Sequence, residues 1–314
     1  MKQKGILLIN LGTPEKAEKK AVKTFLKKFL SDRRVIKLTP IIWQPILQGI
    51  ILNVRPKKSA KLYEKIADPI QGFPLFHYTQ AQQKNLQSLL PDYKIAMSFS
   101  YSQPSIERSL SQLLTEGVND LTIVPMYPQY SGTTVGSVFD QVMRYFIGKD
   151  YLVDLHFIRS YPEHPDYIQF FVNKIQEQLQ KQAVDAIVFS YHGLPTSYVQ
   201  AGDTYPEECQ QTTQKIMEQL GEIPYFQTYQ SKFGPGQWLT PATDETLKQL
   251  PLRGFKNILI VTPGFVVDCL ETLEEIDQEN RQYFLQAGGQ TFTYVPPFNE
   301  DIAFAHLIKH LLKD

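Results

Sequence analysis

A histidine stands at the end of a strongly apolar run in the segment 187–195 (IVFSYHGLP). The residues 187–189 are typical of a buried strand, and Gly193 lets the chain turn directly after His192. The imidazole would therefore lie at the rim where open α/β sheets bind their ligands. Histidine transfers protons or binds metals near neutral pH, but a hydrogen-bonded structural histidine explains the segment alone equally well.

A row of carboxylates follows a second strand-like run, in the segment 263–276 (PGFVVDCLETLEEI). We expect Asp268 to cap a helix by accepting a hydrogen bond from the Glu271 amide, so that the Glu271 side chain projects toward His192. For Glu274–Glu275 the favoured interpretation is structural: their negative charges would neutralise the partial positive charge at the N-terminus of that helix. An imidazole opposite a carboxylate can relay protons or bind a divalent metal with open positions.

Two further segments offer walls for a ligand. The loop 230–245 (QSKFGPGQWLTPATDE) carries Trp238 among glycines and prolines. Such an aromatic residue is more often part of a core, but it can also cover a flat ligand. The segment 125–137 (PMYPQYSGTTVGS) concentrates hydroxyl groups, including that of Tyr130. Those hydroxyls would either bind carboxylates near a helix N-terminus or serve ordinary turns and caps.

Apolar runs alternate with amphipathic segments along the chain, which is typical of parallel sheets with helices on both faces. The expected strands are 5–11, 94–101, 120–127, 152–158, 186–192, 224–229, 257–262 and 291–295. The expected helices are 15–30, 80–90, 105–116, 137–147, 165–181, 206–220, 243–249, 271–287 and 300–312. We favour two α/β domains, 1–160 and 161–314, over one closed barrel, because the segment between them is rich in turn residues. The last helix is a candidate for packing back on the first domain.

The apolar segment 35–54 (VIKLTPIIWQPILQGIILNV) breaks this alternation and is followed by a cluster of basic residues. It predicts either a buried helical hairpin or an exposed apolar lip that includes Ile41 and Trp43. Such a lip, flanked by lysines, would touch a membrane surface or a greasy ligand.

Composition and missing motifs exclude several classes of protein. The 32 basic and 32 acidic residues cancel, so nothing in the net charge points to nucleic acid. Cys209 and Cys269 are too few for a disulfide framework or an all-cysteine metal site, and they favour a reducing, cytoplasmic compartment. The sequence lacks the GxGxxG and GxxxxGK[ST] phosphate loops, the HExxH and GxSxG motifs, a signal peptide and a long uninterrupted apolar run.

Several motifs, in order along nearly the whole chain, resemble those of the ferrochelatases, which insert Fe(II) into a porphyrin in haem synthesis. They are LLINLGTP (7–14), FLSDRRVI (29–36), PMYPQYSGTT (125–134), HPDYI (164–168), SYHGLP (190–195), QSKFGPGQWLTPATDETL (230–247) and PGFVVDCLETLEEI (263–276). The resemblance implies two similar Rossmann-like (chelatase-type) domains, each a parallel four-stranded sheet flanked by helices, with the active-site cleft between them. It also implies no organic cofactor, and no iron–sulfur cluster in the absence of the cysteine-rich extension that some members carry.

Carried over to matching positions, the resemblance implies that His192 is the active-site histidine and Glu271 its acidic partner. These two side chains would accept the pyrrole protons and hold the incoming Fe(II). Asp268 would also orient its own segment. The residues implied to contact the porphyrin are Leu11, Tyr130, Trp238, Phe265 and Asp268.

The expected reaction is insertion of Fe(II) into protoporphyrin IX to form protohaem, the terminal step of haem synthesis. The form of the segment around Cys269 resembles the proteobacterial branch, which uses protoporphyrin. Ser100 stands where some relatives have an arginine that would suit additional propionates. Coproporphyrin III is the alternative substrate, and a non-catalytic tetrapyrrole or metal carrier is the alternative of another class. We expect a cytoplasmic protein, either free or peripheral on the inner face of the membrane through 35–54.

Overall fold

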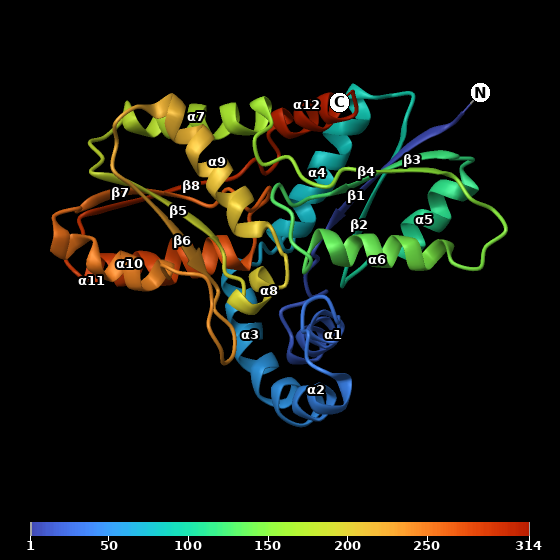
Figure 1. Cartoon of the computed structure of the whole chain (residues 1–314), viewed down its shortest axis with the longest axis horizontal. Coiled ribbons are helices and arrows are strands. Elements are labelled where there is room, and N and C mark those ends of the chain that lie inside the picture. Colours follow the sequence, from blue (N-terminus) through green and yellow to red (C-terminus); the bar gives the residue numbers. More distant parts are fainter. Residues whose placement is uncertain (1, 314) are drawn as a thin grey trace. The chain divides into compact units, whose positions relative to one another are not determined.

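The computed structural model describes residues 2–313, and the chain divides into two compact units (Figure 1). Unit 1 comprises Met1–Ser160 with Glu300–Asp314, and unit 2 comprises Tyr161–Asn299. Each unit contains one four-stranded sheet in which neighbouring strands are parallel. The predicted α/β class, with two four-stranded sheets instead of one barrel, is confirmed.

Unit 1 is built on the strand order β2-β1-β3-β4. Its strands are β1 (Lys4–Asn10), β2 (Lys94–Phe99), β3 (Asp120–Pro125) and β4 (Asp154–Phe157). Its main helices are α1 (Lys19–Leu30), α4 (Pro74–Leu89), α5 (Ile106–Thr115), α6 (Val135–Phe146) and α12 (Ile302–Leu311). Residues 5–10 of the central strand are all buried, because a parallel sheet between helices is covered on both faces.

Unit 2 repeats this arrangement with the strand order β6-β5-β7-β8. Its strands are β5 (Ala186–His192), β6 (Tyr225–Gln230), β7 (Asn257–Val261) and β8 (Thr291–Val295). Its helical elements are α7 (Pro165–Leu179), α8 (Thr196–Gln200), α9 (Tyr205–Leu220), α10 (Thr243–Gln249), η2 (Pro251–Arg253), η3 (Glu271–Asn280) and α11 (Arg281–Gln286). In both sheets the first strand has the second on one side and the third on the other. The carboxyl ends of β1 and β5 therefore lie where open α/β sheets bind ligands.

The structure departs from the predicted helices in several places. The first helix begins at Lys19, four residues later than predicted. The predicted helix 271–287 is two elements: η3, a π-helical segment with a wider hydrogen-bond register, and the α-helix α11. The segment 40–66 is helical throughout, as α2 (Pro40–Ile46), the π-helical η1 (Leu47–Ile51) and α3 (Leu52–Ile66).

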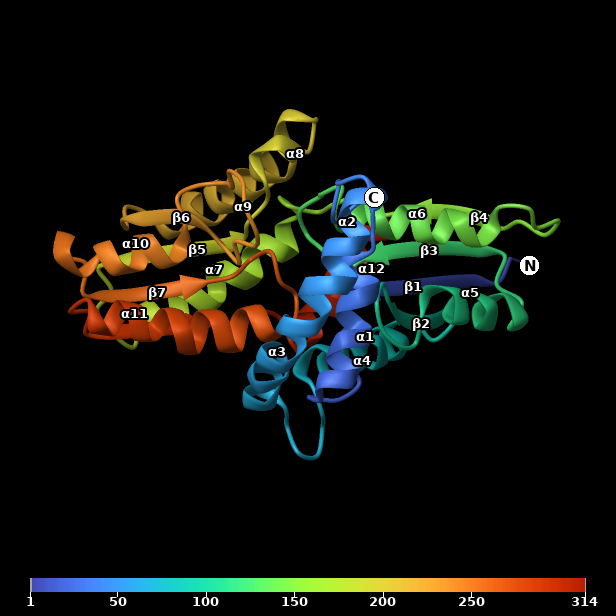
Figure 2. The ribbon, with the colours of Figure 1, turned by 90° about the horizontal axis from the view of Figure 1, so that it is seen from below.

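The two interpretations of 35–54 apply to opposite faces of these helices. Trp43 is only 8% exposed, and its indole N–H donates to the Leu30 carbonyl at 2.6 Å. Ile41 is 89% exposed. The prediction that Trp43 belongs to an exposed lip is therefore wrong, because its ring is buried and hydrogen-bonded to the end of α1. The helix α3 packs beside α1 (Figure 2). Within residues 2–313, no helix is both long and apolar enough to cross a membrane.

The last helix belongs to the first unit. The helix α12 packs along α4 (Figure 1), and the side-chain amide of Asn85 donates to the Glu300 carbonyl at 2.8 Å. Unit 2 accordingly ends at Asn299, whereas the predicted second domain ran on to residue 314.

Candidate active site

His192 is the last residue of β5 and pairs in register with Gln230 of β6. The six residues before it are buried, whereas the histidine itself is exposed, so a packed strand holds an exposed imidazole at its end. Its Nδ1 lies 2.8 Å from the main-chain oxygen of Gly193. A carbonyl oxygen can only accept, so Nδ1 holds the proton of the neutral ring. The lone pair of Nε2 is then available to accept a proton or to bind a metal.

Gly193 is required by close packing beside the histidine. A Cβ atom on this residue would lie 2.7 Å from the Gln230 main-chain oxygen and 3.2 Å from the ring of Trp238. The Gly193 amide also donates to that same oxygen at 2.7 Å. The missing side chain thus allows β5, β6 and the loop of Trp238 to meet.

Trp238 forms one wall of a cavity of about 460 Å³ in unit 2. Other residues of the lining are Gly193, Thr196, Tyr229, Gln230 and Lys232. Within residues 2–313 the buried indole Nε1 of Trp238 has no hydrogen-bond partner. A half-buried indole with an unused donor, next to an exposed imidazole, is suited to covering a flat ligand.

Glu271 is the first residue of η3, and Gln230 fixes this end of the segment. The Gln230 Nε2 donates to the Glu271 main-chain oxygen at 2.8 Å, and its Oε1 accepts from the Ser190 hydroxyl at 2.7 Å. One buried amide therefore connects the strand that carries His192 to the helix that carries Glu271. The Glu271 side chain, at the start of this helix, is half-buried.

Glu275 is a site residue that the sequence analysis assigned to helix electrostatics. One of its carboxylate oxygens accepts from the Ser231 amide at 2.7 Å, and the other accepts from the Ser231 hydroxyl. Ser231 has a left-handed backbone (φ 62°), which this double contact holds in place. The four-residue spacing from Glu271, which places two helical side chains on one face, is the signal that indicates Glu275.

The charges of His192, Glu271 and Glu275 act on one another. Burial raises the pKa of Glu275 above its ordinary value, and the negative charge of Glu271 acts in the same direction. The hydrogen bond from Ser231 and a positive charge on His192 lower that pKa. These two contributions partly offset the effect of burial on the pKa of Glu275. Within residues 2–313, no three His, Cys, Asp or Glu side chains are grouped as a ready-made metal site.

Asp268 has a different role from the predicted helix cap. The residue preceding η3 is Leu270, and the buried Asp268 carboxylate is engaged inside unit 2. It accepts hydrogen bonds from Thr272 and Tyr294 hydroxyls, both at 2.7 Å, and from the Asn299 amide at 2.6 Å. The cap prediction is wrong, because three side chains take up the carboxylate and hold the turn into η3.

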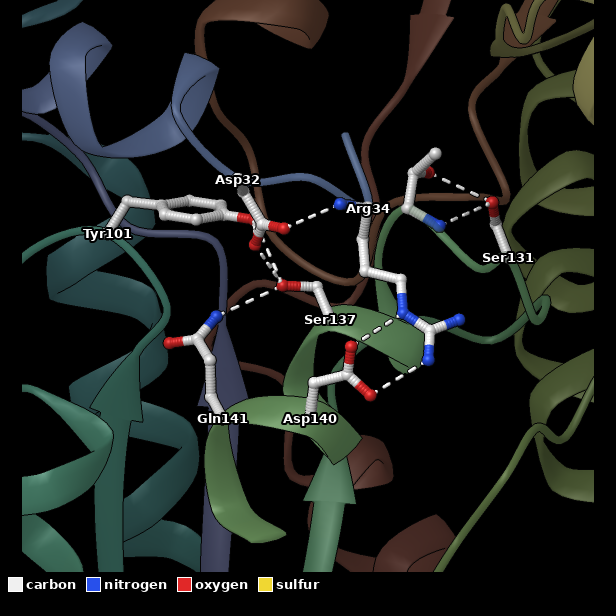
Figure 3. Close-up of polar contacts among 8 residues, drawn as sticks. Asp32, Arg34, Tyr101, Ser131, Ser137, Asp140 and Gln141 are labelled. Atoms are coloured by element: carbon white, nitrogen blue, oxygen red, sulfur yellow. Dashed lines mark hydrogen bonds and ion pairs between the residues drawn. The ribbon is translucent and has the colours of Figure 1, made fainter. Parts of the chain in front are cut away.

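In unit 1, a polar cluster fixes the segment of the FLSDRRVI motif (Figure 3). Asp32 accepts from the Tyr101 hydroxyl at 2.8 Å and from the Ser137 hydroxyl. The Arg34 guanidinium makes two hydrogen bonds to Asp140, at 2.7 and 2.8 Å, and thereby lowers the pKa of that carboxyl. Burial, followed by the charge of Asp32, raises the pKa of Tyr101, which keeps its phenol a donor. This cluster was not predicted.

The remaining predicted porphyrin contacts lie in both units. Leu11, half-buried, directly follows β1, and Tyr130 has the Arg159 guanidinium 4.1 Å from its ring centre. Phe265 is half-buried in the turn after β7. In the hydroxyl-rich segment 125–137 the Ser131 hydroxyl lies 2.9 Å from the Thr133 hydroxyl. These two hydroxyls therefore stabilise the local turn, which was one of the two predicted roles of the segment.

Comparison with known proteins identifies the family. The Ferrochelatase family model matches residues 3–314. The chain is 61% identical over 312 residues to Coproporphyrin III ferrochelatase of Enterococcus faecalis, with 99% of each chain covered. It is 44% identical over 311 residues to Ferrochelatase of Hamiltonella defensa, covering 98% of this chain and 97% of that one.

Solved structures share the fold. SirB from Bacillus subtilis with Fe3+ has a TM-score of 0.61 and 12% identity, covering 99% of this chain and 95% of that one. CbiX, the terminal enzyme for biosynthesis of siroheme in denitrifying bacteria, has a TM-score of 0.54 and 12% identity, covering 98% of each chain. These likenesses concern the fold alone, whereas the family match extends over nearly the whole sequence. The chain belongs to the ferrochelatase family, the lyases of haem biosynthesis that act on iron.

Proposed function

We propose that this protein inserts Fe(II) into coproporphyrin III to form coprohaem, with His192 as the first proton acceptor. Insertion replaces the two pyrrole N–H protons of the free porphyrin by one Fe(II) ion, without oxidation or reduction. Iron and porphyrin are both substrates, and the reaction balances without an organic cofactor. The observation that carries the proposal is the contact of His192 Nδ1 with the Gly193 oxygen, which leaves Nε2 as the basic nitrogen.

Glu271 and Glu275 have complementary tasks in this proposal. Glu271 holds the incoming Fe(II) together with His192, since imidazole and carboxylate are both ligands of ferrous iron. Glu275, whose pKa is raised by burial, accepts a proton from the imidazolium more readily than an ordinary carboxylate would. Membership of an enzyme family favours this catalytic proposal over a non-catalytic carrier.

The substrate is proposed from the 61% identical relative, which is named for coproporphyrin III. The relatives at 43 and 44% identity are named only as ferrochelatases, so they do not distinguish the porphyrins. The expectation of protoporphyrin IX rested on the local likeness around Cys269, on Ser100 and on the apolar segment 35–54, which would suit a greasy ligand. Identity across the whole chain is the stronger argument, and coproporphyrin III is now preferred.

The porphyrin contacts proposed from the sequence remain proposals. Trp238 and Phe265 of unit 2, and Leu11 and Tyr130 of unit 1, offer half-buried apolar or aromatic surface. Asp268 is proposed to act by orienting its segment, since its carboxylate is already engaged by Thr272.

We propose in addition that the protein works in the cytoplasm and touches the membrane peripherally through residues 35–54. Both cysteines are free thiols, as is usual in a reducing compartment. Several apolar side chains of this segment, including Ile41, face outward.

Steady-state iron insertion with each porphyrin, dispersed in detergent at matched free concentration, tests the activity and its substrate. We expect a higher kcat/KM for coproporphyrin III, by at least about tenfold, which equals about 1.4 kcal/mol of transition-state binding. A tenfold advantage for protoporphyrin IX would instead make that porphyrin the preferred substrate, while the proposed iron insertion would still stand. Porphyrin binding without iron insertion for either substrate would instead favour a carrier.

A further inference from the structure

We infer that Asn299 is a positioning residue for iron insertion, because it holds the turn that leads into Glu271. The inference rests on the proposed function for its effect on turnover. It goes beyond the orienting role proposed for Asp268, because it names the side chain that holds the turn and gives the Asp268 carboxylate a hydrogen-bonding task that does not require its charge.

The turn between β7 and η3, residues 262–270, is enclosed by other parts of unit 2. Each of the residues 266–269 is no more than 5% exposed. Near the start of the turn, the Tyr167 hydroxyl of α7 donates to the Pro263 carbonyl at 2.6 Å. Glu271 follows this turn directly, so any displacement of the turn would also move the carboxylate that is proposed to hold Fe(II).

Asn299, the last residue of unit 2, makes three hydrogen bonds to this turn. Its backbone amide donates to the Val266 carbonyl at 3.2 Å. Its side-chain Oδ1 accepts from the Asp268 backbone amide at 2.8 Å, and its Nδ2 donates to Asp268 Oδ2 at 2.6 Å. Both halves of the side-chain amide are therefore used, and a side chain with only acceptors or only donors cannot make both contacts.

The segment that carries Asn299 is itself held in place. The backbone of Asn299 is left-handed (φ 49°), a conformation that asparagine adopts more readily than most residues. The preceding Phe298 is 2% exposed and stacks on Phe170 with the ring centres 3.8 Å apart. The anchored ring and the left-handed backbone together fix the place of the amide.

Asp268 transmits this constraint to η3. Its Oδ1 accepts from the hydroxyls of Thr272 and Tyr294, both at 2.7 Å. Thr272 is fully buried and follows Glu271 directly in the chain. Burial, followed by the charge of Asp268, raises the pKa of Tyr294, so this phenol stays a donor. The carboxylate thus links Asn299 to the first turn of η3.

An exchange of the two side chains separates these hydrogen bonds from the negative charge. In Asn299→Asp, two carboxylates face each other across the 2.6 Å contact and repel each other. In the double variant Asp268→Asn, Asn299→Asp, the amide placed at position 268 donates to the carboxylate placed at position 299. That carboxylate also accepts from the backbone amide of residue 268, while the remaining side-chain oxygen there still accepts from Thr272 and Tyr294. The exchange therefore preserves each of these contacts and moves only the charge.

Steady-state iron insertion into coproporphyrin III by the whole chain tests the consequence for catalysis. We expect Asn299→Asp to lower kcat and to raise KM for Fe(II), so that kcat/KM falls between about tenfold and about a hundredfold, the scale of a small misplacement of a catalytic group. KM for the porphyrin should stay within about a factor of two. The double variant should recover to within a few-fold of the unchanged protein. Asn299→Gly tolerates the left-handed backbone, removes only the side chain and should resemble Asn299→Asp.

The matched control is Asn173→Asp, the same chemical change at an exposed asparagine of α7, which should leave all three kinetic constants unchanged. A lower kcat with unchanged KM for Fe(II) in the Asn299 variants would indicate only a loss of folded protein and would overturn the inference. Recovery of the fold without recovery of turnover in the double variant would also overturn it, because the charge of Asp268 would then act in the reaction.

Hydrogen–deuterium exchange tests the hold on the turn without the reaction. Amides within 266–275 should exchange faster in Asn299→Asp and return to slow exchange in the double variant, because local opening exposes them. Unchanged exchange in Asn299→Asp would overturn the inference. Absence of iron insertion by the unchanged protein would overturn the proposed function instead, and the exchange data would still decide whether Asn299 holds the turn.

Discussion

Gln230 donates a hydrogen bond to the main-chain oxygen of Glu271 at 2.8 Å while its backbone pairs in register with His192 across two strands. The glutamine side chain is 3% exposed, so water does not compete for this contact. This amide group thus links the strand that ends in the imidazole to the first turn of η3. Neither residue of the proposed catalytic pair needs to contact the other for their geometry to be fixed.

Replacing this amide should reduce turnover more than substrate binding. Gln230→Leu removes the donor to Glu271 and the acceptor from Ser190, and an unsatisfied buried group costs ~1–3 kcal/mol. Gln230→Glu keeps the acceptor and removes the donor. We expect both variants to lower kcat with little change in KM, measured by steady-state iron insertion. A lower melting temperature with unchanged kcat would restrict Gln230 to a purely structural role.

His192→Ala should nearly abolish iron insertion while leaving porphyrin binding within a few-fold, because loss of a general base typically costs ~10²–10⁴ in rate. Iron insertion and fluorescence titration of the porphyrin give the two quantities. His306→Ala, which removes an exposed histidine of α12, is the matched control and should behave normally. Near-normal turnover of the His192 variant would rule out its role in proton abstraction.

Glu271→Gln keeps the shape of the side chain and removes its charge. We expect a large loss of kcat with the fold intact, because a first-turn glutamate contributes only ~0.3–1 kcal/mol to its helix. Circular dichroism and thermal unfolding would check the fold alongside the kinetic assay. A variant that unfolds would instead show that Glu271 is structural.

The raised pKa of Glu275 should make the free energy of unfolding depend on pH. Its folded-state pKa is raised by burial, so ionisation disfavours the folded state and the folded protein binds the proton more tightly. Its contribution to the free energy of unfolding is present below the ordinary pKa of 4.5 and is lost as pH rises through the raised value. Glu275→Gln should lack this decline. Urea unfolding of both proteins at a series of pH values isolates the difference, and a difference that does not vary with pH would contradict the assignment.

The two faces of the segment 35–54 should respond in opposite ways. Trp43→Ala removes a buried ring with a hydrogen bond to Leu30 and should cost ~3–5 kcal/mol of unfolding free energy. Ile41→Ala, on the exposed face, should change stability by no more than ~0.5 kcal/mol. Thermal or urea unfolding of the two variants and of the unchanged protein measures both differences in unfolding free energy. Similar losses for both would mean that Ile41 is covered in solution.

Local patterns in the sequence were enough to predict the strands. β5 begins and ends at the predicted residues, because an unbroken apolar run bounded by polar residues is visible without any knowledge of the fold. The π-helical register of η3 was not predictable, since it depends on which carbonyl each amide selects and not on apolar periodicity. A helical hairpin was one of the two predictions for 35–54, but the continuous helical path to Ile66 was obscured by Pro45 and Pro56, which normally interrupt helices.

Side chains whose partners are distant in sequence account for the site features that were missed. The carboxylate of Glu275 is bound by Ser231, forty-four positions earlier, and Arg34 pairs with Asp140, 106 positions later. Apart from the four-residue spacing between Glu271 and Glu275, nothing local distinguishes such residues from solvated surface charges. His192 and Glu271 were predictable as candidates because His192 ends one strand-like apolar run and Glu271 lies in the segment that follows another.

The hydrogen bond between His192 Nδ1 and the Gly193 oxygen also limits the capacity of the imidazole. With one ring nitrogen already holding a proton, the ring can take up a single additional proton. Each porphyrin releases two, so the stoichiometry of a turnover exceeds what this side chain stores. In the proposed reaction, a His192 that accepts both protons has to pass the first to a neighbouring carboxylate before the second arrives.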